Sequence, residues 1–209
     1  MRGAFITLEG TEGVGKSTCL GHVRAFLAAA EIPVIVTREP GGTALGEHVR
    51  DWILQGKHGR LSAETETLLM FAARAFHLDE VIRPALAAGR WVVCDRFSDA
   101  TAAYQGGGRG AAPEWIESLR AAVHADLEPD LTLLLDAPVE VGLARIRART
   151  KDHFEREKPG FFGRVRQAYL ELAEREPERI RVIDAQPPLP DVRQQISQQM
   201  TAFVRDYRG

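Results

Sequence analysis

Five short apolar segments recur along the chain at wide intervals. Each has the length of a buried β-strand and is nearly continuous in its apolar character, and together they cover residues 4–8, 33–37, 91–94, 131–135 and 180–183. The stretches between them have helical character, as from Ser17 to Ala30, and no hairpin turn signal joins two of the segments. Near-continuous apolar strands that alternate with helices are typical of parallel sheets covered on both faces. The pattern therefore predicts an α/β fold with a five-stranded parallel sheet flanked by helices on both faces.

Glycines and charged residues follow the carboxyl ends of these predicted strands. In strand order they are the stretches 10–17 and 38–43, the pair Asp95–Arg96, Asp136 and Asp184. Ligands of open parallel sheets bind beyond the carboxyl ends of the strands. We therefore expect the functional chemistry at one edge of the sheet.

The stretch 10–17, Gly-Thr-Glu-Gly-Val-Gly-Lys-Ser, fits the pattern G-x-x-x-x-G-K-[ST] at every fixed position. Its position between a strand and an amphipathic helix is the context in which this pattern forms a phosphate-binding loop, or P-loop. Backbone N–H groups and the helix N-terminus supply positive partial charge to phosphate oxygens. Lys16 is expected to neutralise bridging oxygens, and Ser17 to offer its hydroxyl to Mg²⁺.

Composition narrows the class of protein. With 209 residues the chain is long enough for one substantial core, and we expect a single domain, 1–209. The formal net charge of −2 gives no electrostatic footprint for nucleic acid or an anionic membrane. No apolar run approaches the roughly 20 residues of a membrane span. The first strand begins at once, without a signal peptide, so we expect a cytoplasmic protein.

Two segments each allow two interpretations. Residues 145–158 are densely charged, and they form either a solvated helix and loop or a lid whose arginines close over a polyphosphate. Arg145 and Arg149 are four residues apart and could share one helix face. The helix predicted from Thr65 to Leu78 is apolar over much of its circumference. It either packs within its own domain or pairs with a second subunit.

Residues beyond the P-loop must decide among GTPases, motors, ATPases and small-molecule kinases. The guanine-reading tetrapeptide Asn-Lys-x-Asp of GTPases does not occur, and large ATPase modules usually need a longer chain. Asp95 ends an apolar strand beside the P-loop strand. In P-loop enzymes a carboxylate in this position binds Mg²⁺ or one of its water ligands. Arg96 can then fork onto an acceptor phosphate. These features favour a small kinase.

Six stretches carry a more specific pattern, namely 9–18, 37–43, 71–74, 95–97, 103–110 and 169–173. In this order, and over nearly the whole chain, they resemble the bacterial thymidylate kinases. The resemblance implies a P-loop kinase fold with a mobile lid at about 145–158 and a homodimer. From charge and composition we expect no nucleic-acid or membrane partner. The resemblance implies transfer of the γ-phosphoryl group of ATP to dTMP, giving dTDP and ADP for dTTP synthesis, with Mg²⁺ as cofactor. It also implies a cis peptide bond between Glu39 and Pro40.

The resemblance implies which residues bind ATP and carry out the transfer. The ATP-binding residues would be Gly10, Glu12, Gly13, Gly15, Lys16, Ser17 and Thr18. Ser17 and Asp95 would hold the metal. The catalytic residues would be Lys16, Asp95, Arg96 and Arg149. His153 stands where many relatives have arginine, so Lys151 and Arg156 remain alternatives to Arg149 as the lid cation. Gly13 stands where one branch of the family has a catalytic arginine, so the chain resembles the branch that takes its cations from the lid.

The resemblance also implies a dTMP pocket. Its residues would be Glu12, Arg50, Phe71, Arg74, Arg96, Thr101, Tyr104 and Gln105. Phe71 would stack on the thymine, Arg74 would hydrogen-bond the base, and Tyr104 would lie against C2′ of the sugar. Arg50 and Arg96 would hold the acceptor phosphate, with Glu12 on the 3′-hydroxyl side.

Two rival functions remain open on the residues alone. The first is a kinase for another nucleoside monophosphate or for a deoxynucleoside. A deoxynucleoside hydroxyl would need a general base, whereas a phosphate monoester, with a second pKa of about 6, is already largely a dianion. The second is a P-loop protein that senses nucleotide and transmits the signal to a partner.

Overall fold

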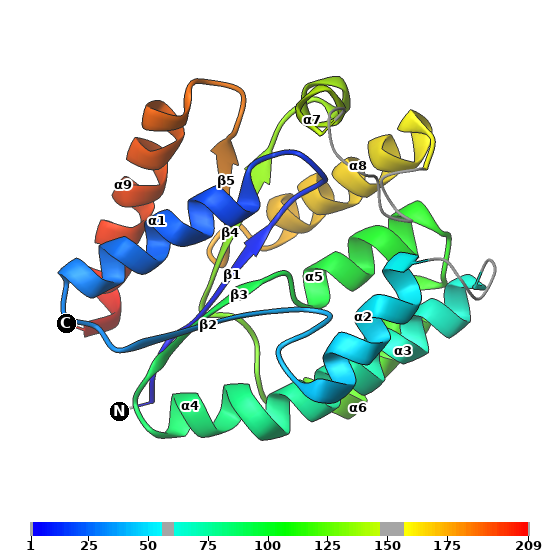
Figure 1. Cartoon of the computed structure of the whole chain (residues 1–209), viewed down its shortest axis with the longest axis horizontal. Helices are drawn as coiled ribbons and strands as arrows, with labels where there is room; N and C mark the ends of the chain where they lie inside the picture. The colour runs from blue at the N-terminus through cyan, green and yellow to red at the C-terminus, as the bar shows by residue number, and fades with distance from the viewer. Residues whose placement is uncertain (1, 56–60, 147–156, 209) are drawn as a thin grey trace.

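The computed structural model describes residues 2–55, 61–146 and 157–208. Its centre is a five-stranded sheet in which all neighbouring strands are parallel, in the order β2-β3-β1-β4-β5 (Figure 1). The strands are β1 (Phe5–Glu9), β2 (Val34–Arg38), β3 (Trp91–Asp95), β4 (Leu131–Asp136) and β5 (Ile180–Asp184). All five strands fall on the apolar segments, so the predicted parallel α/β sheet is confirmed.

Helices connect the strands and cover both faces of the sheet. They are α1 (Lys16–Ala29), α2 (Ala44–Gln55), α3 (Ala63–His77), α4 (Arg83–Ala87), α5 (Ser98–Thr101), α6 (Pro113–His124), α7 (Val139–Arg145), α8 (Pro159–Arg175) and α9 (Leu189–Arg208). Two π-helical segments, η1 (Leu78–Ile82) and η2 (Ala102–Gly108), continue α3 and α5. Among the described residues, no helix combines the length and apolar character needed to cross a membrane.

The alternation of side chains along β1 divides the core into layers. Ile6 and Leu8 pack with residues of α1 and α9, whereas Phe5 packs with residues of η1 and α4. Figure 1 shows α1 and α9 on one side of the sheet and α4 on the other. Successive strand residues point to opposite faces, so a β1 whose five residues are all buried fits only a sheet covered on both sides.

The strand register brings the carboxyl ends together. Asp95 pairs with Leu8 of β1 on one side and with Arg38 of β2 on the other, and Asp136 pairs with Asp184. The loop after β1, the turn after β2 and the segment after β3 therefore start side by side. This is the edge at which the sequence predicted the functional chemistry.

Candidate active site

A cleft of about 490 Å³ opens at this carboxyl edge. It brings together most residues that the sequence analysis singled out: Glu12, Gly13, Gly15, Lys16, Ser17, Thr18, Arg50, Arg74, Asp95, Arg96, Thr101, Tyr104 and Gln105. Of the remaining residues, Gly10 and Phe71 do not line the cleft, and Arg149 lies outside the described residues. Arg145 and Ile146, where the predicted lid begins, contribute to the wall.

The P-loop needs glycine at two close contacts. Gly10 and Gly13 have φ values of 135° and 75°, which side chains rarely allow. A Cβ atom would lie 2.3 Å from the Leu135 carbonyl oxygen at Gly10 and 2.0 Å from the Gly142 carbonyl oxygen at Gly13. At Gly10 the P-loop backbone thus lies against the backbone of β4, although Gly10 does not line the cleft. Helix α1 begins after Gly15 with no side-chain cap, so its first N–H groups are available to an anion.

The side chain of Lys16 folds back onto the backbone of the P-loop. Its Nζ donates to the carbonyl oxygens of Gly10 and Thr11, both at 2.8 Å, and lies 3.8 Å from Glu12 Oε2. The side chain is only 7% exposed. Burial lowers the pKa of Lys16 to about 8. The Arg96 charge also lowers this pKa, whereas the Glu12 carboxylate raises it and offsets part of the shift. A bound polyphosphate would supply the negative charge that this ammonium lacks.

The pair expected to hold a metal fits that task. Asp95 ends β3 and Ser17 stands in the first turn of α1, and both line the cleft. The Oδ1 atom of Asp95 is buried and accepts no hydrogen bond from any residue that the structure describes; Arg96 Nη1 lies 3.8 Å away. A buried carboxylate oxygen left without a donor is a suitable ligand for a hard cation, or for one of its waters.

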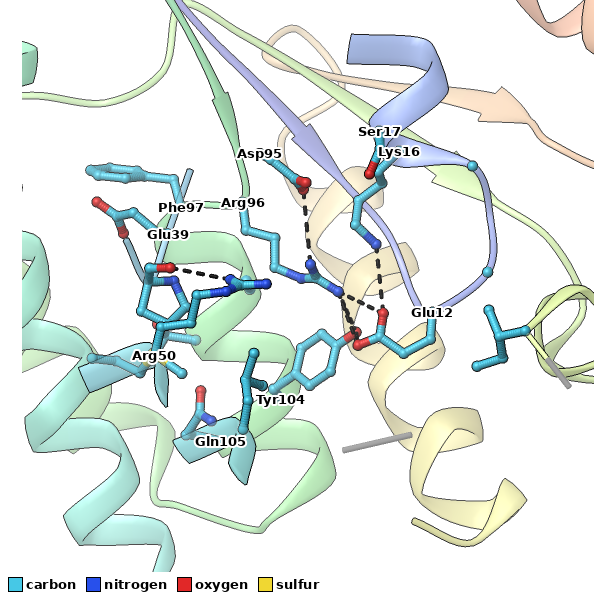
Figure 2. A pocket seen from close by; sticks show the side chains of 18 of the residues that line it. Glu12, Lys16, Ser17, Glu39, Arg50, Asp95, Arg96, Phe97, Tyr104 and Gln105 are labelled. Carbon is cyan, nitrogen blue, oxygen red and sulfur yellow. Dashed lines mark hydrogen bonds and ion pairs between the residues drawn. The ribbon is translucent and has the colours of Figure 1, made fainter. Parts of the chain in front are cut away.

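Arg96 is the centre of the ionic network in the cleft. Its Nη2 donates to Glu12 at 2.7 and 3.0 Å and to the Tyr104 hydroxyl at 3.3 Å (Figure 2). Burial disfavours its charge, but Glu12 chiefly holds the pKa of Arg96 well above its ordinary value. The residue has a φ of 68°, a conformation that costs of order 1–3 kcal/mol and is concentrated at functional sites.

Glu12 is held ionised by its neighbours. Burial opposes its charge, yet Arg96 and Lys16 lower the pKa of Glu12 below its ordinary value. Tyr104 donates its hydroxyl to the same carboxylate at 3.0 Å. Glu12 therefore neutralises the cations of the cleft in this structure and is a weak base.

Arg50 of α2 faces the same cavity as Arg96 (Figure 2). Its Nη1 donates to the Pro40 carbonyl oxygen at 3.2 Å, next to the Glu39–Pro40 peptide bond, which is cis as the resemblance implied. Burial lowers the pKa of Arg50, and the charges of Arg38 and Arg96 add to the effect. An anion between Arg50 and Arg96 would relieve their repulsion.

Arg74 is held by a carboxylate that sequence reasoning did not assign. Its Nε donates to Glu39 Oε2 at 2.7 Å, and its Nη2 donates to the Phe97 carbonyl at 3.1 Å and to Thr101 Oγ1 at 3.0 Å. Glu39 also lies 2.9 Å from Nδ1 of the buried His77. Within the described part of the chain, Arg74 Nη1 has no hydrogen-bond partner. Both N–H groups of this nitrogen are thus left for a ligand.

Gln105 is oriented by another buried carboxylate. Its Nε2 donates to Glu66 Oε2 at 3.3 Å, and Arg109 Nε donates to the same oxygen at 3.2 Å. Both Glu39 and Glu66 were missed because an isolated glutamate in a sequence gives no sign of burial. The only sequence signal that could have pointed to Glu39 was its place within the motif Arg38–Thr43.

The structure does not bring Phe71 to the cleft, contrary to the stacking role that the resemblance implied. Phe71 is 3% exposed and packs with Ala111 and Ile116. The residue before it, Met70, lines the cleft instead. Successive residues of an α-helix differ in direction by about 100°, so one position decides between the cleft and the core.

Glu9, at the end of β1, is a third buried acid that the sequence did not reveal. It accepts hydrogen bonds from the Phe97 backbone N–H and from the Tyr169 hydroxyl, both at 2.7 Å. Burial, together with nearby Asp99, raises the pKa of Glu9 to about 8. Glu9 is therefore largely protonated at neutral pH.

The chain as a whole is similar to thymidylate kinases. A family model described as thymidylate kinase matches residues 8–196. The chain is 54% identical to the thymidylate kinase of Methylobacillus flagellatus over 97% of this chain and 99% of that one. It is 52% identical to that of Pseudomonas syringae pv. tomato over the full length of both.

A solved structure is similar in fold as well. The crystal structure of thymidylate kinase from Ehrlichia chaffeensis superimposes with a TM-score of 0.77 at 31% identity, covering 96% of this chain and 99% of that one. Similarity in sequence and in fold thus extends from end to end, and it includes the edge of the sheet where the P-loop and the arginines meet. The chain belongs to the thymidylate kinase family.

Proposed function

We propose that the protein transfers the γ-phosphoryl group of ATP to dTMP, giving dTDP and ADP for dTTP synthesis. The observation that carries the proposal is the presence of two cationic subsites in one cleft. The P-loop with Lys16 forms one, and Arg50 with Arg96 forms the other. A donor polyphosphate and an acceptor phosphate can therefore meet between them. The full-length similarity to thymidylate kinases supports dTMP as the acceptor.

The acceptor chemistry requires alignment rather than a base. A phosphate monoester is largely a dianion at neutral pH, because its second pKa is about 6. The barrier lies in bringing this dianion in line with another polyanion, which cations and fixed geometry lower. Lys16 would neutralise the donor oxygens, while Arg50 and Arg96 would hold the acceptor. The lid would supply one further cation, Arg149 or one of its alternatives Lys151 and Arg156.

Ser17 and the unpartnered oxygen of Asp95 would hold Mg²⁺. When bound there, the ion neutralises charge on the phosphate oxygens of the donor. Asp95 lies at the end of the strand next to β1, and this places its carboxylate beside the loop that cradles those oxygens.

The remaining wall of the cleft suits a deoxyribonucleotide. Arg74 Nη1 would donate to the base, with Thr101 and Gln105 beside it. The Tyr104 ring would lie against C2′ of the sugar. A ribose hydroxyl would then collide with the ring or displace the sugar, and either result spoils the alignment.

A panel of acceptors tests the proposal. Purified protein is incubated with ATP and Mg²⁺ together with dTMP, dUMP, other monophosphates and thymidine, and product formation is measured. We expect dTMP to be the best acceptor. Turnover of thymidine instead would favour a nucleoside kinase, although the lowered pKa of Glu12 makes it a poor base for that reaction. Binding without turnover of any acceptor would favour a nucleotide sensor.

We further propose a homodimer that forms in the cytoplasm through α2 and α3. These two helices pack together and carry four large apolar side chains that are more than two-fifths exposed: Leu45, Trp52, Leu68 and Phe76. An exposed apolar surface shared by adjacent helices is typical of a subunit interface.

A further inference from the structure

The part of the cleft that would receive a base is bounded on one side by helix α3. Two consecutive apolar residues of this helix, Met70 and Phe71, stand one turn before Arg74. Met70 lines the cleft together with Arg74, four residues later. Side chains at this spacing lie one above the other on the same helix face.

Phe71 is engaged elsewhere. The guanidinium of Arg74 lies over the Phe71 ring, 4.8 Å from its centroid, and also 5.0 Å from the centroid of the Phe97 ring. The imidazole of His124 is nearly parallel to the Phe71 ring, at 18° and with centroids 6.3 Å apart. The phenyl ring therefore supports Arg74 from within the core.

Recognition of a planar base needs an apolar wall for its face and donors or acceptors for its edge. Arg74, with its unpartnered Nη1, and Gln105 supply polar groups for the edge. Met70 supplies an apolar side chain from the helix face that also carries Arg74. We infer that Met70, and not Phe71, is the residue of α3 against which the pyrimidine ring of the acceptor lies, an inference that rests on the proposed function.

A methionine in this position has a specific physical consequence. Its polarizable thioether makes favourable contacts with aromatic rings, and its unbranched chain adapts to their position. Such a wall contributes equally to the ground state and the transition state, because the base does not react. Loss of the side chain should therefore raise the KM for the acceptor and leave kcat nearly unchanged.

The test is Met70→Ala, examined with dTMP and with 2-deoxyribose 5-phosphate, which lacks the base. We expect the KM for dTMP to rise about tenfold, within the range of hydrophobic pockets. The kcat and the KM for ATP should remain within about twofold. The inhibition constant of 2-deoxyribose 5-phosphate as a competitor of dTMP should not change. Met70→Leu, which keeps an apolar wall, should retain most of the affinity for dTMP.

Leu69→Ala is the matched control, because Leu69 is on the same helix and packs against the same hydrophobic cluster as Met70 without lining the cleft. It should lower the melting temperature and leave the KM for dTMP unchanged. An unchanged KM in Met70→Ala, or equal weakening of dTMP and 2-deoxyribose 5-phosphate, would overturn the inference. Absence of dTMP turnover in the wild type would instead refute the proposed function, and calorimetric binding of dTMP would then still test Met70.

Discussion

Binding of ATP should draw a proton onto Lys16 at alkaline pH. In the nucleotide-free cleft, burial and the Arg96 charge lower the pKa of Lys16 to about 8, since Glu12 compensates only in part. The phosphates of ATP place several negative charges beside the ammonium, and they should return its pKa to 10.5 or above. The protonated form binds ATP, so the deprotonated protein must first take up a proton.

The expected size of the effect follows from these two pKa values. At pH 9, about 0.9 of the free Lys16 side chains are neutral, compared with about 0.1 at pH 7. Binding should therefore take up about 0.9 proton at pH 9 and about 0.1 at pH 7. By linkage, the association constant should fall about tenfold between pH 7 and pH 9, which is about 1.4 kcal/mol.

Isothermal titration calorimetry measures this uptake directly. ATP is titrated without acceptor in buffers of different ionisation enthalpy. The slope of the observed binding enthalpy, plotted against the ionisation enthalpy of the buffer, gives the number of protons taken up on binding. Lys16→Arg is the control, because a guanidinium stays charged over this range and should bind ATP without proton uptake. If the wild type took up no proton at pH 9, the lowered pKa of Lys16 would be wrong.

Three further predictions concern stability, sugar choice and assembly. The pKa of Glu9 is about 8 in the folded protein, whereas its ordinary value is 4.5. The free energy of unfolding of the wild type should therefore fall by a few kcal/mol as the pH rises from 4.5 to 8. Glu9→Gln should flatten that slope in urea unfolding, and an equal slope in both proteins would contradict the burial of a protonated Glu9. Tyr104→Ala should reduce the deoxy-to-ribo ratio of kcat/KM at least about tenfold, and Tyr104→Phe should preserve it; an unchanged ratio in the alanine variant would remove Tyr104 from sugar selection. Light scattering should give a dimer for the wild type and a monomer for Leu68→Asp, and a wild-type monomer at micromolar concentration would exclude the proposed interface.

The sheet and the P-loop were predictable because local sequence is sufficient for both. A strand whose neighbouring residues Phe5, Ile6 and Leu8 are apolar on both of its faces is best buried on both sides, and all five residues of β1 are buried. Likewise, Gly10 and Gly13 are required by backbone approach, whatever surrounds the loop. The order of the strands also brought the predicted P-loop, Asp95 and Arg96 to one edge.

The direction of individual side chains was not predictable in the same way. Met70 and Phe71 are both apolar residues in a helix with a broad apolar surface. The hydrophobic pattern of the sequence is therefore compatible with either of them at the cleft. The packing of α3 against α6 and η2 determined that Phe71 enters the core and Met70 faces the cavity.

Charge states likewise depended on contacts between distant parts of the chain. Glu9 is separated from Tyr169 by 160 residues, and Glu39 from Arg74 by 35, yet each pair is hydrogen-bonded. Residue types alone indicate carboxylates with ordinary pKa values. A pKa depends on desolvation and on nearby charges, and both come into existence only when the chain folds.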